Sequence, residues 1–107
     1  MNRQDTIKKL IENLEHVIKY PTMYMGRATW DAVNIFIYGF SCAYGAMGVP
    51  LTLDIRRQAT NSRGWEFTSI RGADQMREQG LSEEQIVQEL LLIEIKILEL
   101  VAGRLEA

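Results

Sequence analysis

The chain has 107 residues, of which 47% are hydrophobic and 24% charged, and its formal net charge is −2. This length fits a single domain with one core over residues 1–107. General nucleic-acid binders carry a strong basic excess, so no nucleic-acid partner is expected. The charge is uneven, because residues 81–107 hold six Asp/Glu and two Lys/Arg, whereas residues 1–80 hold eight and ten.

Cysteine usage and hydropathy bear on where the protein works. Cys42 is the only cysteine, so no disulfide can form within the chain and a reducing, cytoplasmic location is expected. The opening residues, MNRQDTIKKL, lack the apolar run of a signal peptide. No charged residue occurs between Asp31 and Asp54, an interval about as long as a minimal membrane span. Asn34, Ser41 and several glycines interrupt it, which favours a buried helix of a soluble bundle and no membrane contact.

Apolar residues at three- and four-residue steps predict a first helix over about 5–20. These residues are Ile7, Leu10, Ile11, Leu14, Val17 and Ile18. Asn2 or Asp5 can cap the first turn, and Pro21 disfavours helical geometry in the residue before it, so the helix should end there. His16 is the only histidine and has no second His or Cys nearby. We interpret it as a solvated surface residue, and no metal site is expected.

A second helix is predicted over about 30–48. Thr29 is a credible N-cap, and Asp31 favours the positive end of the helix dipole. Apolar residues lie on both sides of this helix, so it should be covered nearly all round. Small residues would let another backbone approach closely, namely Gly39, Ala43, Gly45 and Ala46.

Residues 51–70, LTLDIRRQATNSRGWEFTSI, can be interpreted in two ways. Leu53 and Ile55 alternate with polar residues, as do Trp65 and Phe67, and a turn-like NSRG lies between the two pairs. This pattern slightly favours a β-hairpin. The alternative is a helix over 65–79, and a short helix is expected at about 72–79.

The last predicted helix covers about 82–102. Ser82 with Gln85 matches a capping box, and Gly103 is a natural C-cap. Its apolar residues fill more than one face, and so short a chain can hardly cover them alone. We therefore expect a homo-oligomer that buries this helix or the second one. The expected interface residues are Phe36, Phe40, Tyr44, Leu91, Ile95 and Leu98.

Together these elements predict a mainly α fold. It is a small helical bundle of three main helices, with a short β-hairpin or short helix in the middle. A hairpin would make the fold α+β.

The segment LEHVIKYPTMYMGR, Leu14–Arg27, joins the first two helices. It resembles the N-terminal segment of the gyrase B-subunit and type II topoisomerase ATPases, which has the form L-E-x-V-x-x-R-P-x-M-Y-I-G. The matching residues are Leu14, Glu15, Val17, Pro21, Met23, Tyr24 and Gly26, and Tyr20 stands where that family has Arg. The family's next helix carries a catalytic glutamate and a magnesium-binding asparagine. Here VNIFIYGFSCAYGAMG contains no acid and no later Asp-x-Gly-x-Gly loop follows, so ATPase activity is not expected.

The same segment is also similar to a group of small uncharacterised bacterial and phage-type proteins with a K/R-x-P-x-M-Y-x-G opening. The order in this chain is YPTMYMG, then WDAVNIFIYGF, then GW at 64–65, then SEEQIVQELLLIEIKIL. This resemblance implies architecture and no agreed activity. A purely structural role for the segment is the alternative, in which Met23 and Met25 tuck beneath the connection and Gly26 permits a reversal.

No paired carboxylates, Ser/His/Asp or Cys/His set, or Gly-rich phosphate loop is placed for catalysis, so an enzyme and a cofactor are not expected. The first predicted function is a non-catalytic oligomer that acts by protein–protein contact, as small inhibitors, immunity proteins and phage anti-defence proteins do. The alternative is an oligomer that sequesters an anionic, nucleotide-like ligand. A structural assembly factor is a third possibility. The candidate ligand-binding residues are Tyr24, Arg27, Trp30, Arg56, Arg57, Arg63 and Trp65.

Overall fold

The computed structural model describes residues 2–49, 52–67 and 72–106. Within these ranges the chain forms six helices and no strand. The helices are α1 Arg3–Lys19, α2 Pro21–Met25, α3 Trp30–Ala46, α4 Leu53–Ser62, α5 Gly72–Glu78 and α6 Glu83–Glu106. The predicted mainly α fold, a small helical bundle, is therefore confirmed.

The first two helices meet at a proline corner. Asn2 Oδ1 accepts a hydrogen bond from the Asp5 amide at 2.8 Å and caps α1. Pro21 ends α1 and is the first residue of α2, where its missing N–H costs nothing. Gly26 has φ +76°, which lets the chain leave α2 and turn toward α3. Met25 packs against the core, whereas Met23 is exposed, so only one of the two methionines lies beneath the connection.

The hairpin prediction for 51–70 is wrong, because Leu53–Ser62 is the helix α4. Thr52 Oγ1 accepts a hydrogen bond from the Ile55 amide at 3.2 Å and starts this helix. Ile55 and Ala59 lie four residues apart and are both buried, so the helical period decides which face packs. The alternative helix over 65–79 is wrong at residues 65–67, which are not helical, whereas the short helix expected at about 72–79 is present as α5, Gly72–Glu78. Residues 51 and 68–70 of the predicted hairpin lie outside the described part of the chain.

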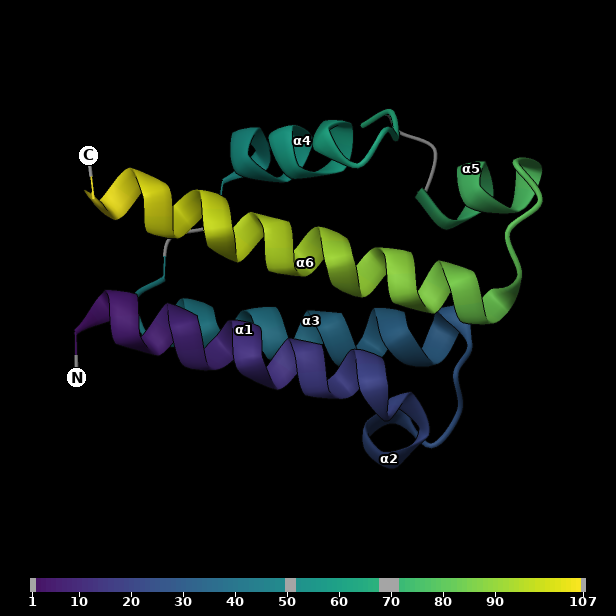
Figure 1. Ribbon diagram of the computed structural model, residues 1–107, viewed down its shortest axis with the longest axis horizontal. Helices are drawn as coiled ribbons and strands as arrows, with labels where there is room; N and C mark the ends of the chain where they lie inside the picture. The colour runs from purple at the N-terminus through teal and green to yellow at the C-terminus, as the bar shows by residue number, and fades with distance from the viewer. Residues whose placement is uncertain (1, 50–51, 68–71, 107) are drawn as a thin grey trace.

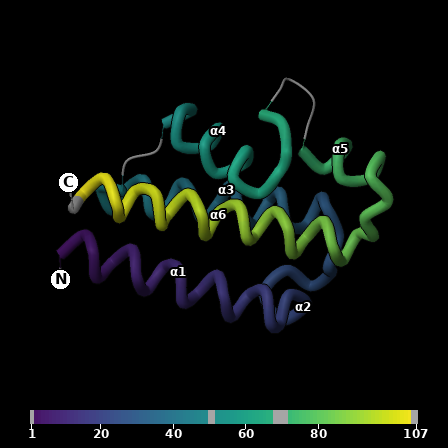
Figure 2. Tube along the Cα trace, turned by 45° about the horizontal axis from the view of Figure 1, so that its top comes forward, coloured from purple at the N-terminus to yellow at the C-terminus, as the bar shows by residue number. Residues whose placement is uncertain are grey.

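Helix α6 is the centre of the molecule. Figure 1 and Figure 2 show it running through the middle, with α1 on one side, α4 and α5 on the other, and α3 behind. It runs antiparallel to α1, and Gln4 Nε2 of α1 donates to the Ala102 carbonyl of α6 at 2.8 Å. Its buried apolar residues are Ile86, Val87, Leu91, Ile93, Ile97, Leu98 and Val101. The long apolar helix is thus largely covered within one chain.

The structure confirms the predicted start of α6 but not its predicted end. The predicted capping box is confirmed, since Ser82 N donates to Gln85 Oε1 at 2.8 Å and Gln85 N donates to Ser82 Oγ at 3.2 Å. The predicted C-cap at Gly103 is wrong. A C-cap glycine usually adopts a left-handed conformation with positive φ. Gly103 does not have a positive φ, and the helix continues past it to Glu106.

Helix α3 is covered on one side only. Val33 and Tyr44 are fully buried against the core, but Ile35 and Tyr38 are largely exposed. The expectation that α3 is covered nearly all round is therefore wrong for a single chain. None of the helices in the described ranges combines the length and apolar character needed to cross a membrane.

Candidate functional site

After its first turn, which carries the exposed Asp31, the exposed side of α3 has no charged residue and is largely apolar. We call the residues Ile35, Tyr38, Gly39, Cys42 and Ala46 the outer face of α3. Tyr38 and Gly39 lie three and four residues after Ile35, Cys42 lies three residues after Gly39, and Ala46 lies four residues after Cys42, so all five share one side of the helix, and all are exposed. Ile35 and Tyr38 are both 73% exposed, which is unusual for large apolar side chains in the middle of a helix.

Two glycines in α3 have no steric reason to be glycine within the single chain. A Cβ built at Gly39 or at Gly45 would meet no heavy atom within 4 Å, and neither has a positive φ. A glycine inside a helix costs roughly 0.5–1 kcal/mol relative to alanine. The small surface at these positions therefore serves no contact that the described part of the chain makes.

A second feature is a hollow bounded by α3, α4, α5 and α6, which we call the aromatic cavity. Its volume is about 570 Å³, and the residues that line it include Trp30, Trp65, Phe67, Asn34, Arg56 and Glu94. Gln75 fixes one wall: its Oε1 accepts from the Glu66 amide at 3.1 Å, and its Nε2 donates to the Glu66 carbonyl at 2.7 Å. This pair of hydrogen bonds holds the segment that carries Trp65 and Phe67 against α5.

The floor of the aromatic cavity contains a buried acid. Glu94 is 3% exposed, and its Oε1 lies 2.9 Å from Arg56 Nη1. Its Oε2 accepts a hydrogen bond from the Tyr44 hydroxyl at 3.2 Å. Burial raises the pKa of Glu94 above its ordinary value, while Arg56 and Tyr44 act in the opposite direction. Burial and the nearby Glu94 also raise the pKa of Tyr44, so its hydroxyl stays a donor.

Arg63 supports the cavity wall from outside. Its Nε and Nη2 donate to the two oxygens of Glu89, each at 2.8 Å, in the bidentate arrangement that fits a carboxylate best. Trp65 Nε1 donates to Glu89 Oε1 at 3.1 Å. The hydrogen bonds from Arg63 hold the pKa of Glu89 below its usual range, and Trp65 adds to this effect. Glu89 therefore links α4, Trp65 and α6.

Other arginines near the cavity are also engaged within the chain. Arg77 forms ion pairs with Glu83 at 2.8 Å and Asp74 at 3.3 Å, and it lies 5.6 Å from the ring centroid of Trp30. Arg57 lies 5.8 Å from the ring centroid of Phe67.

The structure therefore divides the predicted ligand-binding residues. Trp30, Arg56 and Trp65 line the aromatic cavity together. Arg57 and Arg63 lie outside its lining, Arg63 facing Glu89. Glu94 was missed as a site residue, although an acid inside the apolar run LLLIEIKIL was a visible signal.

Tyr24 and Arg27 lie at the proline corner, away from the cavity. The Tyr24 hydroxyl is hydrogen-bonded to Nδ1 of His16. His16 is exposed, as the sequence predicted. Arg27 is an exposed residue that lies 3.6 Å from Asp31.

The predicted oligomer interface lies mostly inside the single chain. Tyr44, Leu91 and Leu98 are fully buried in the core. Phe36, Phe40 and Ile95 are partly buried and pack against it. Gly39 and Ala46 of the outer face were predicted only as small residues that another backbone can approach. The exposed Ile35 and Tyr38 were not predicted as interface residues, because an α3 that is apolar all round gives no periodic signal for the side that packs.

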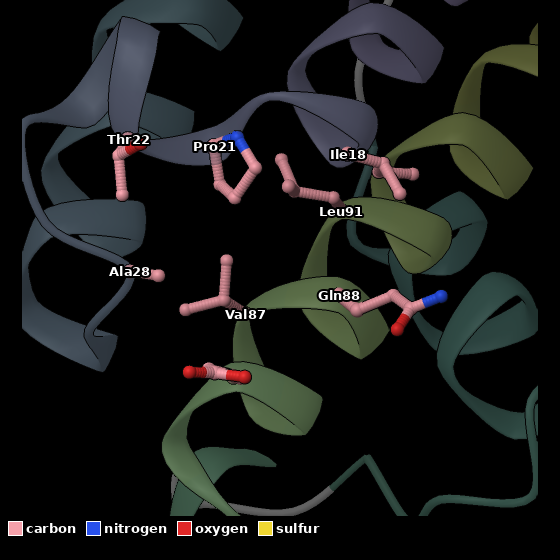
Figure 3. A pocket seen from close by; sticks show the side chains of 8 residues that line it. Ile18, Pro21, Thr22, Ala28, Val87, Gln88 and Leu91 are labelled. Carbon is pink, nitrogen blue, oxygen red and sulfur yellow. The ribbon is translucent and has the colours of Figure 1, made fainter.

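The proline corner packs against α6 around a smaller hollow of about 280 Å³. Figure 3 shows Val87 and Leu91 of α6 on one side of this hollow and Pro21 on the other. Ile18 and Ala28 complete its apolar lining. Residues of the corner segment and of α6 thus line this hollow together.

Among the residues that the structure describes, no three His, Cys, Asp or Glu side chains gather into a group that could hold a metal ion. The chain matches no protein-family model, and no curated protein or solved structure matches it. The two resemblances of the segment Leu14–Arg27 therefore stay predictions.

Proposed function

We propose that the protein is a non-catalytic binding protein that acts by protein–protein contact, and that the outer face of α3 is its contact surface. The supporting observation is the exposure of Ile35 and Tyr38 in the middle of α3, in a stretch of sequence that has no charged residue between Asp31 and Asp54. Contiguous exposed apolar surface of this kind is typical of interaction sites. Small inhibitors and immunity proteins work through such surfaces, and a cytoplasmic location stays part of the prediction.

The first occupant that we propose is a second copy of the chain. An uncharged face can meet its own copy around a two-fold axis without like-charge repulsion. The open space at Gly39 and Gly45 would let the two α3 helices approach closely. Burying one large apolar side chain contributes about 1.5–3 kcal/mol, so Ile35 and Tyr38 from two copies supply a substantial driving force.

The expected dimer is weak. Helix α3 has 17 residues and is therefore about 25 Å long. One face of such a helix is smaller than the roughly 800 Å² per partner that a standard stable interface buries. We therefore expect dissociation in the micromolar range, which leaves the face available to a larger partner.

The anionic-ligand alternative has less support. Arg56, Arg63 and Arg77 each bind a carboxylate of the same chain. An anion would have to displace those carboxylates, and Glu94 would then be left buried without its cation.

Sedimentation equilibrium tests the proposal. The wild-type chain is expected to show a concentration-dependent dimer, and Tyr38→Glu is expected to abolish it, because a charge would be buried at the interface. Leu53→Glu is the matched control, since Leu53 is 70% exposed on α4 and lies outside the outer face. The control should dimerise like the wild type. A wild-type chain that stays monomeric into the millimolar range would overturn the proposed self-association.

Cysteine cross-linking tests the geometry separately. Cys42 is exposed on the outer face, so two paired α3 helices should bring two copies of it within reach of a short bis-maleimide reagent. A chain with Cys42→Ser and Glu12→Cys is the control, because Glu12 is exposed on α1. Equal cross-linking of both chains would show that the contact is not at α3.

A further inference from the structure

The outer face of α3 differs between its two halves. Its N-terminal half carries the two large side chains, Ile35 and Tyr38, both of which are largely exposed. Its C-terminal half carries Cys42 and Ala46, and Gly45 is exposed beside them. The N-terminal half therefore projects from the helix, whereas the C-terminal half is flat.

This difference bears on how two copies of α3 can pair around a two-fold axis, which allows a parallel or an antiparallel pair. In a parallel pair, Ile35 and Tyr38 would meet the same residues of the partner, and their bulk would hold the flat halves apart. In an antiparallel pair, the projecting half of each copy lies on the flat half of the other. Close packing without voids therefore favours the antiparallel pair.

The two ends of α3 carry opposite charges. Asp31 lies in the first turn, four residues before Ile35 and on the same side of the helix, and its side chain is exposed. The start of α1 lies at the other end of α3 (Figure 1), where a Cβ built at Gly48 would be 3.6 Å from Arg3 Nη2. Arg3 is exposed and forms no ion pair with any residue that the structure describes.

These charges favour the same arrangement as the packing. Gly39 lies close to midway between Asp31 and Gly48 in the sequence, so an antiparallel pair that crosses there brings Asp31 to the end of the partner's α3. That end holds the partner's Arg3, and opposite ends of the two helix dipoles meet there as well. A parallel pair would instead place Asp31 near Asp31 and Arg3 near Arg3. Arg27, 3.6 Å from Asp31, already offsets part of its charge, so the ion pair adds to the packing and does not replace it.

We propose that two copies of the chain pair through antiparallel α3 helices that cross near Gly39, with Arg3 of each copy beside Asp31 of the other. This arrangement rests on the self-association proposed above and adds its geometry. Each copy then covers Ile35 and Tyr38 of its partner and supplies the carboxylate that Arg3 lacks among the described residues of its own chain.

Cross-linking of mixed chains tests the orientation. One chain carries Cys42→Ser with Asn34→Cys, and a ¹⁵N-labelled chain carries Cys42→Ser with Ala46→Cys, both at exposed positions of α3. These positions are 12 residues apart, about 18 Å along the helix axis, which a short bis-maleimide cannot span. An antiparallel pair should therefore give cross-links between the two different chains, identified by mass spectrometry. A parallel pair should link only like chains. Replacing either chain by one with Cys42→Ser and Glu12→Cys controls for random collision, because Glu12 is exposed on α1.

A charge reversal tests the ion pair. Arg3→Glu places an acid beside the partner's Asp31 and should raise the dissociation constant of the dimer about three- to tenfold at low ionic strength, and less at high salt. A glutamate in the first turn of α1 suits the helix dipole, so the variant should fold. Lys9→Glu makes the same change of charge at an exposed position of α1 and is the matched control. In a parallel pair, Arg3→Glu would exchange one like-charge contact for another and leave the dissociation constant unchanged.

The outcomes separate the orientation from the self-association itself. Cross-links between like chains alone would overturn the antiparallel arrangement and leave the proposed dimer in place. Cross-linking no stronger than that of the Glu12→Cys control would overturn the arrangement, and sedimentation of the wild-type chain would then show whether any dimer forms. An effect of Arg3→Glu no larger than that of Lys9→Glu would overturn the ion pair.

Discussion

Arg56 of α4 and Glu94 of α6 form an ion pair at 2.9 Å whose acid is almost completely buried. The Tyr44 hydroxyl of α3 donates to the second carboxylate oxygen. The three residues thus connect α3, α4 and α6 through one polar cluster inside an apolar core. Because a buried charge is costly without its partners, this cluster fixes how the three helices pack.

Removing the acid should destabilise the protein. Glu94→Ala removes the acceptor of the buried Tyr44 hydroxyl and of Arg56, so we expect the free energy of unfolding to fall by about 1–3 kcal/mol. Glu99→Ala, exposed on the same helix, is the control. Urea denaturation followed by circular dichroism measures both. Replacing Arg56 and Glu94 together by leucine should recover much of the loss, since apolar packing can substitute for a buried ion pair. A single variant as stable as the wild type would contradict the importance of this cluster.

The pH dependence of stability should have opposite signs at Glu94 and Glu89. The pKa of Glu94 is raised on folding, so its contribution is present below the ordinary value of 4.5 and is lost as the pH rises through the folded pKa. The pKa of Glu89 is lowered, so its contribution is present above 4.5 and is lost as the pH falls through the folded pKa. The denaturant midpoint should be measured against pH across the acidic range. Relative to the wild type, the slope of midpoint against pH should increase in Glu94→Gln and decrease in Glu89→Gln. Parallel curves would disprove this prediction.

The core of α6 should tolerate truncation poorly. Leu91 is fully buried where α6 meets the proline corner. Leu91→Ala should lower the free energy of unfolding by about 2–5 kcal/mol, because the removed methyl groups leave a cavity. Leu53→Ala, at an exposed position of α4, should change it by less than about 0.5 kcal/mol. Thermal unfolding compares the two, and similar losses would mean that α6 is not the centre of the core.

Gly39→Ala should separate stability from association. The added Cβ meets nothing within 4 Å, so the helix should gain roughly 0.5–1 kcal/mol from the lower conformational entropy of alanine. The same methyl group would keep two α3 helices apart, and the dimer should dissociate more readily. Unfolding and sedimentation measured on one sample check both effects. A variant that is more stable and still dimerises fully would place the contact away from Gly39.

Much of the fold could be predicted because three helices have strong local signals. Residues 5–20, 30–48 and 82–102 were predicted as helices, and the observed helices are Arg3–Lys19, Trp30–Ala46 and Glu83–Glu106. Apolar periodicity fixed the face of α1, and the capping box fixed the start of α6. Helix α4 was missed because Leu53 and Ile55 alternate like a strand, whereas the burial of Ile55 and Ala59 depends on contacts with α6.

The candidate site could be predicted only in part. Trp30, Arg56 and Trp65 were predicted as ligand-binding residues because arginine and tryptophan side chains suit such a site. Tertiary packing brings them together around one cavity. Their charge partners could not be predicted, since Glu94 and Glu89 lie on a helix far away in sequence. The outer face of α3 could not be predicted from the sequence either. Ile35 and Phe36 are both large apolar residues, and packing against the core decides which one is exposed.

The position of α6 in the chain has a consequence for synthesis on the ribosome. Helices α1, α3, α4 and α5 each make their main long-range contacts with α6, which is translated after all of them. Until it emerges, the nascent helices can bury little apolar surface against one another, and short isolated helices are marginal in water. Stable folding should therefore begin only when α6 leaves the exit tunnel, and before that point the nascent chain would be a substrate for chaperones and proteases.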